Sequence, residues 1–83
     1  MATLEYLYNQ FEREYKKFEE YDYDDYILEV HIVFLDGKVV HTNMYGFMIN
    51  RDRIFFAGEM LSPADIDHVT YLIEKRIVED DEV

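Results

Sequence analysis

The sequence has no cysteine, no tryptophan, one proline and only three glycines among its 83 residues. A chain without cysteine can form neither disulfide bonds nor thiolate metal sites. Its glycines follow no phosphate-cradling pattern, so no nucleotide-binding loop is predicted. No apolar run approaches the roughly 18 residues that a membrane-spanning helix needs. The protein must therefore be stabilised by the packing of its side chains.

Positive charge is also scarce, because eight Lys and Arg stand against nineteen Asp and Glu, for a net charge of −11. A hydrophobic content of 49% and an aromatic content of 17% argue against a disordered chain. A folded protein with this charge should be repelled by nucleic acid and by anionic membrane surfaces. We therefore expect no direct binding to either, and a basic protein as the partner.

The chain is short enough to form one small domain, residues 1–83, with residues 79–83 as an acidic C-terminal tail. The core of such a domain is thin, and eight Tyr and six Phe supply much of the area that it can bury. Homodimerisation would add buried area and is an open alternative. The first residues lack the basic start and the apolar segment of a secretory signal, so we expect a soluble protein in the cytoplasm.

The first predicted element is a helix that begins at Leu4, with Thr3 as its N-cap. Glu19 and Glu20 fall in its last turn, where carboxylates oppose the helix dipole and cost roughly 0.3–1 kcal/mol each at low salt. A local cost without a local gain is expected at functional sites. The stripe of apolar side chains that predicts the helix has the spacing of one helix face: Leu4, Leu7, Tyr8, Phe11, Tyr15 and Phe18.

Three strands are predicted next, at residues 26–35, 38–49 and 54–57. Asp36-Gly37 predicts a two-residue type I′ hairpin between the first two. In that register Ile32 would lie opposite His41, and Val30 opposite Asn43. His41 and Asn43 are poor core residues, so a bulge, with Gly46 as the candidate, would be needed to restore the pattern.

A second helix is predicted after Ser62, which has the residue type of an N-cap and is followed by Pro63 at the first helical position. Ile66, Val69 and Ile73 then follow at helical spacing. We therefore predict an α+β fold, a single small domain with the order helix, three-stranded antiparallel meander, helix. Both helices should cover one face of the sheet.

This topology brings the C-terminal end of the second helix, and the acidic tail after it, beside the acidic segment that follows the first helix. Arg51 and Arg53 are expected at the same end, where they could neutralise part of the charge. Tyr23 should add exposed contact area. The candidate partner-binding residues are Glu14, Glu19, Glu20, Asp22, Tyr23, Asp24, Asp25, Glu79, Asp80, Asp81 and Glu82.

The acidic end has two interpretations. Carboxylates about 6–7 Å apart can stand in for the phosphates of one nucleic-acid strand, or they can serve solubility alone. Metal and acid–base chemistry find little support, because His31 and His41 fall on opposite faces in the predicted register and no HExxH motif is present. No catalytic residue, metal or cofactor is predicted, and the protein is not expected to be an enzyme.

A small, cysteine-free, aromatic-rich domain with acidic runs at residues 19–25 and 79–82 resembles the DNA-mimic inhibitors encoded by bacteriophages. The resemblance implies an inhibitor that acts in the host cytoplasm during host takeover and occupies the basic DNA-binding surface of a host protein. Known targets of such inhibitors are HU-type nucleoid proteins, restriction enzymes, uracil-DNA glycosylase, CRISPR effectors and RNA polymerase, and the HU-type target is favoured. The alternative is a non-enzymatic homodimeric interaction or assembly module whose charge serves solubility only.

Overall fold

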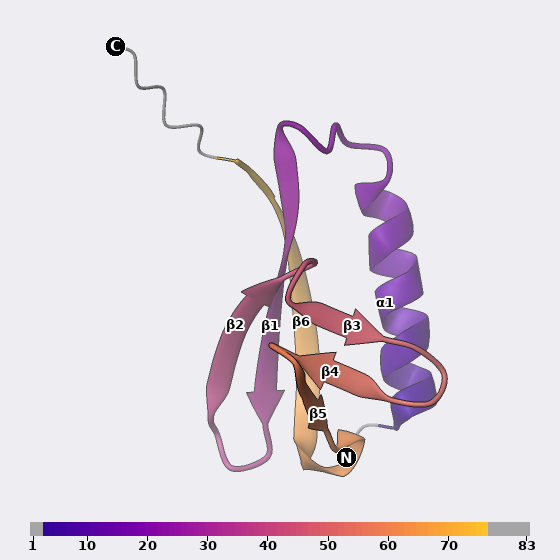
Figure 1. Cartoon of the computed structure of the whole chain (residues 1–83), viewed down its shortest axis with the longest axis vertical. Coiled ribbons are helices and arrows are strands. Elements are labelled where there is room, and N and C mark those ends of the chain that lie inside the picture. The colour runs from indigo at the N-terminus through magenta and orange to yellow at the C-terminus, as the bar shows by residue number, and fades with distance from the viewer. Residues whose placement is uncertain (1–2, 77–83) are drawn as a thin grey trace.

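A computed structural model describes residues 3–76 (Figure 1). Within this range the chain forms one α-helix and six strands, arranged as two three-stranded antiparallel sheets. The predicted helix–meander–helix fold is therefore wrong. The elements are α1 (Leu4–Phe18), β1 (Tyr26–Phe34), β2 (Val39–Asn43), β3 (Phe47–Ile49), β4 (Ile54–Phe56), β5 (Glu59–Leu61), the 3-10 turn η1 (Pro63–Asp65) and β6 (Ile66–Lys75).

The large sheet has the strand order β2-β1-β6, and the small sheet has the order β3-β4-β5. In Figure 1 the helix α1 runs alongside β6, and the small sheet crosses over one face of the large sheet. The core lies between these three layers, because each of them contributes buried side chains to one cluster: Leu7, Val30, Ile32, Phe47, Ile49, Ile54, Ile66 and Val69.

The predicted start and apolar stripe of the first helix are confirmed, but its predicted end is wrong. Glu19 is the C-cap and Glu20 lies beyond it, so Lys16 and Lys17 occupy the last turn. Thr3 is the N-cap of α1, and its hydroxyl oxygen accepts a hydrogen bond from the backbone N–H of Tyr6 at 3.1 Å. Leu7 and Phe18 on the apolar stripe are fully buried. The side-chain amide of Gln10 donates to the backbone oxygen of Val69 at 2.8 Å, which joins α1 to β6.

The hairpin between β1 and β2 has a three-residue loop instead of the predicted two-residue type I′ turn. The backbone N–H of Phe34 donates to the oxygen of Lys38 at 2.8 Å, which leaves residues 35–37 as the loop, and only Gly37 in it has a positive φ, +92°. The register therefore moves by one residue, and a one-residue shift exchanges the two faces of a strand. His41 now lies opposite His31 on the outer face, so no bulge is needed.

The predicted second strand, residues 38–49, is in fact two strands that belong to different sheets. A turn at residues 44–46 separates β2 from β3. Gly46 lies in that turn, where a Cβ would collide with the side-chain oxygen of Thr42. The chain can make this sharp exit from the large sheet because residue 46 has no side chain.

The predicted second helix is wrong because a β-bulge imitates helical spacing. Val33 pairs with His68 but Phe34 pairs with Ile66, so one extra residue of β6 lies between them. Ile66 and Val69 therefore both face the core although they are three residues apart. Ser62 makes no side-chain capping bond, and η1 ends after a single turn.

Candidate functional site

The acidic loop, residues 19–25, joins α1 to β1 and is ordered by its own hydrogen bonds. The backbone oxygen of Asp22 accepts from the N–H groups of Asp25 at 3.0 Å and Tyr26 at 2.9 Å. The Asp22 carboxylate accepts from the N–H of Asp24 at 2.9 Å. This local bonding is typical of Asp in tight turns, and it fixes the direction of the following residues.

Aromatic packing ties the acidic loop to the end of the helix. The ring of Tyr23 stacks on the fully buried Phe18, with centroids 5.3 Å apart and planes 23° apart. The hydroxyl groups of Tyr23 and Tyr15 lie 3.4 Å apart, and Tyr21 meets Tyr26 edge to face. Tyr23 stays 46% exposed, as predicted, so one side of its ring supports the loop and the other side faces solvent.

The Tyr15–Tyr23 contact makes Tyr23 harder to ionise. The hydrogen bond with Tyr15 and partial burial raise the pKa of Tyr23 to about 12, and the charge of Glu19 contributes to the shift. The protonated form of Tyr23 is therefore favoured within the acidic surface.

The five carboxylates of the loop are exposed, and none of them forms an ion pair within residues 3–76. They are Glu19, Glu20, Asp22, Asp24 and Asp25. Glu14 differs from them, because it lies on α1 with a side chain only 27% exposed and pairs with Lys17 at 3.4 Å. An exposed pair of this kind contributes little to stability and withdraws Glu14 only partly from the acidic surface.

The strand β6 runs toward the acidic loop, in the direction that the sequence predicted for a helix. Tyr26 pairs with Lys75, and the N–H of Arg76 donates to the backbone oxygen of Asp25 at 2.7 Å. The last described residue therefore lies beside the loop. The four candidate residues of the tail, Glu79, Asp80, Asp81 and Glu82, lie outside the described residues.

A different arginine from the predicted ones lies at the acidic end. Arg51 lies over the ring of Tyr8, 5.5 Å from its centroid, beside the N-terminal half of α1. Its predicted place at the acidic end is wrong, because the chain leaves the large sheet before it reaches Arg51. Arg76 takes that place and donates to the hydroxyl of Tyr45 at 2.9 Å. The sequence signal for Arg76 was its position at the end of the last predicted element.

An apolar groove of about 820 Å³ adjoins the acidic loop on the side of the small sheet. Tyr15 belongs to both, because its ring lines the groove and its hydroxyl meets Tyr23. Met48 is 59% exposed on the outer face of the small sheet, in register with Phe55. The side chains that line the groove are mostly aromatic or methionine: Phe11, Tyr15, Met44, Tyr45, Phe47, Met48 and Phe55.

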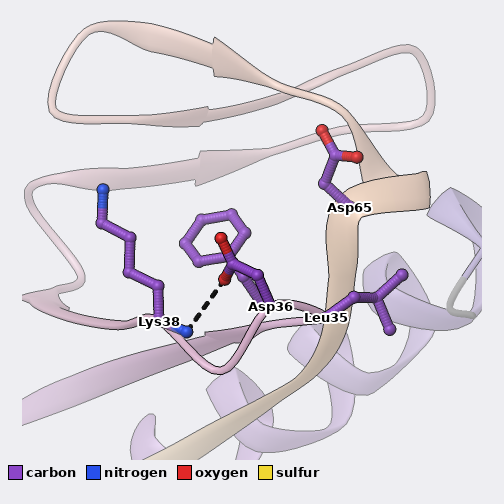
Figure 2. A pocket seen from close by; sticks show the side chains of 5 residues that line it. Leu35, Asp36, Lys38 and Asp65 are labelled. Carbon is purple, nitrogen blue, oxygen red and sulfur yellow. Dashed lines mark hydrogen bonds between the residues drawn. The ribbon is translucent and has the colours of Figure 1, made fainter.

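A second pocket, of about 330 Å³, lies at the opposite end of the large sheet, where the β1–β2 hairpin meets η1 (Figure 2). It is lined by Phe34, Leu35, Asp36, Lys38 and Asp65. The Asp36 carboxylate accepts a hydrogen bond from the backbone N–H of Lys38 at 2.9 Å, so it stabilises the hairpin loop. The Asp36 carboxylate therefore has a structural role in the hairpin loop. The pocket is separate from the acidic loop.

The histidines are placed differently from the prediction. His31 and His41 were expected on opposite faces, but they are cross-strand partners on one face, with stacked rings 4.3 Å apart. His68 lies near the start of β6, and its Nδ1 is hydrogen-bonded to the carboxylate of Asp67 at 2.6 Å. Among residues 3–76 no group of three or more His, Asp or Glu side chains is arranged to hold a metal ion.

Comparisons with protein-family models, with curated proteins and with solved structures found no match. Among the described residues, α1 is neither long nor apolar enough to cross a membrane.

Proposed function

We propose that the protein is a DNA-mimic inhibitor, which binds the basic DNA-binding surface of another protein and keeps DNA away from it. The observation that carries the proposal is the ordered acidic loop. Its backbone is held by Asp22, and Tyr23 is stacked on the buried Phe18. Exposed carboxylates on such a support form a compact negative surface, which a groove rich in Lys and Arg attracts.

The apolar groove supports a protein as the partner. Aromatic and methionine side chains are frequent anchors of interfaces, because they bury large areas and adapt their shape. Since Tyr15 belongs to both surfaces, a partner seated on the acidic loop also reaches the groove. Charge would then govern the rate of encounter, and the groove would slow dissociation.

An HU-type nucleoid protein is the first target to test. Proteins of this kind bind DNA through charge and bending more than through contacts to bases. A mimic of their ligand needs to reproduce shape and charge only. Such an inhibitor would act in the cytoplasm of the host cell.

The test is a competition assay in which the protein displaces a fluorescent DNA duplex from HU, followed by anisotropy at increasing NaCl. The double variant Asp24→Lys/Asp25→Lys should weaken inhibition by at least about tenfold, since both charges face solvent in the loop. Asp22 is left unchanged because its carboxylate holds the loop. Circular dichroism verifies that the variant remains folded.

The matched control is Asp52→Lys/Glu5→Lys, which changes the net charge equally at two exposed positions, with Glu5 in the first turn of α1 at the end away from the loop. It should inhibit within about twofold of the unaltered protein, because exposed charges far from the contact are screened. Equal losses in the two variants, or inhibition that is the same at low and high salt, would refute the mimic. Light scattering on the same samples detects the alternative, a homodimer whose association does not depend on salt.

A further inference from the structure

The β1–β2 register brings two histidines together at the closest kind of cross-strand position. Phe34 bonds to Lys38, and Met44 bonds to Leu28, so these are hydrogen-bonded positions of the ladder. Bonded and non-bonded pairs alternate along an antiparallel ladder. The pair His31–His41 falls on a non-bonded position, where side chains approach most closely.

The two imidazole rings lie face to face on the open face of the large sheet, which is the face away from the small sheet. Their centroids are 4.3 Å apart and their planes differ by 9°. His41 is exposed and His31 is half-exposed, whereas the neighbouring Val30 and Ile32 are buried on the opposite face. Within residues 3–76, His68 is the one histidine whose ring is hydrogen-bonded to another side chain. The ring nitrogens of His31 and His41 are therefore free to bind a ligand.

We propose that His31 and His41 form a binding site for a divalent transition-metal ion such as Zn²⁺, Ni²⁺ or Cu²⁺. Neutral imidazole nitrogens are preferred ligands of these ions. Metal–nitrogen bonds of 2.0–2.1 Å in a tetrahedral site place two ligand nitrogens about 3.3 Å apart. The ring centroids are 4.3 Å apart, so the two side chains are near enough to share one ion. The lone pairs of stacked rings lie in parallel planes, so binding requires both surface side chains to rotate out of the stack until one nitrogen of each faces the ion.

The site has two protein ligands, and solvent completes the coordination, since the described residues hold no cluster of three. Glu29 lies two residues before His31 on the same face and adds negative charge that attracts a cation. Two imidazoles favour Cu²⁺ over the other divalent ions of the first row, whereas Mg²⁺ and Ca²⁺ prefer oxygen ligands. An ion held by both histidines links β1 to β2 and stabilises the folded chain.

The inference does not depend on the proposed function, and it is tested with the full chain and Zn²⁺ or Ni²⁺ alone. The histidine ring resonances are followed by NMR and the melting temperature by circular dichroism, both in excess Mg²⁺ so that carboxylates are occupied. Zn²⁺ should shift the signals of His31 and His41 together and raise the melting temperature. Paramagnetic Ni²⁺ should broaden the same two signals first.

Variants assign the ligands. His31→Gln and His41→Gln should each weaken Zn²⁺ binding by at least about tenfold, because a chelating pair becomes a single ligand. His68→Gln is the matched control and should bind within about twofold of the unaltered protein, since His68 lies outside the pair. His41 is exposed, so its variant decides the outcome even if His31→Gln proves unstable.

Three outcomes would overturn the inference. The first is equal binding by His41→Gln and the unaltered protein, and the second is loss of binding in His68→Gln. The third is Zn²⁺ binding that is seen without Mg²⁺ and is lost in excess Mg²⁺, which would assign the ion to carboxylates, including those of residues 79–82.

Discussion

Tyr71 holds a polar group in the core without a partner. Its ring packs between Phe11 and Phe47, with centroids 6.1 Å and 6.3 Å away, and its hydroxyl oxygen is buried with no hydrogen bond within residues 3–76. Burial raises the pKa of the Tyr71 phenol, and the charge of Glu14 adds to the shift. A buried hydroxyl without a partner lowers the free energy of unfolding by roughly 1–3 kcal/mol, whereas the ring that carries it stabilises the core by packing.

Tyr71→Phe should therefore increase the free energy of unfolding at pH 7 by about 1 kcal/mol, measured by urea denaturation. Tyr6→Phe is the control, because Tyr6 is 56% exposed, and it should change stability little. A destabilised Tyr71→Phe variant would mean that the hydroxyl makes a favourable bond.

Two tyrosines with raised pKa values, Tyr23 and Tyr71, make the stability of the fold depend on pH in the alkaline range. The pKa values of Tyr23 and Tyr71 are raised in the folded state, so the preference of the fold for the neutral phenol over the phenolate is fully present below the unfolded value of about 10. Above that pH the unfolded chain loses protons first, and this contribution falls as pH rises through about 12 for Tyr23. Urea titrations between pH 9 and 12 should therefore show a smaller loss of stability in Tyr71→Phe than in the unaltered protein.

At the scale of single elements, the β4–β5 hairpin places Ala57, a residue with a Cβ, in a left-handed backbone conformation. The loop is Ala57-Gly58, with φ of +52° and +85°, which is the geometry of a type I′ turn. A left-handed conformation costs roughly 1–2 kcal/mol for a residue with a Cβ, whereas Asn tolerates it. Ala57→Asn should therefore raise the free energy of unfolding by about 0.5–1 kcal/mol in urea denaturation.

Ala57→Val is the opposite change and should lower the free energy of unfolding, because a β-branched residue fits this conformation least well. Both variants keep the backbone bond from residue 57 to the oxygen of Gly46. Equal stability of the two variants would contradict a strained turn.

Elements with a regular pattern and an end signal could be predicted from the sequence, and those that depend on irregular backbone could not. The capped stripe of α1 and the strands β1 and β4 fall in the first class. The bulge before Val69 gave β6 a helical spacing, although its Ile, Val and Thr content is typical of strands. The loop at Gly37 moved the register by one residue, and that single shift decided where His41 lies. The acidic loop was visible as a charge pattern, but its support by Phe18 depends on tertiary packing.

At the scale of the whole molecule, charge repulsion opposes folding. The net charge is −11, and within residues 3–76 the one Lys–carboxylate pair, between Lys17 and Glu14, is exposed. Salt screens repulsion between exposed charges, since the Debye length falls from about 30 Å at 0.01 M to about 3 Å at 1 M. Raising NaCl across this range should therefore raise the melting temperature by several degrees.

A variant with Glu19→Gln, Glu20→Gln and Asp25→Asn should gain less from salt, because it has lost part of the repulsion. Calorimetry at two NaCl concentrations measures both proteins. A melting temperature that is indifferent to salt, or the same gain in both proteins, would show that the acidic loop does not dominate the repulsion.

The hydrogen bond from Gln10 to Val69 also determines how copies of this chain can meet. It occupies the carbonyl of Val69 on the outer edge of β6, along which α1 lies, so this part of the edge is a poor template for a further strand. Among the described residues, the edge of the large sheet without a helix along it is that of β2, a strand of five residues. A fibre needs two usable edges in every copy, whereas two β2 edges that pair with each other close the assembly at a dimer. A helix joined to β6 by one glutamine thus opposes open-ended polymerisation of this aromatic-rich chain through its large sheet.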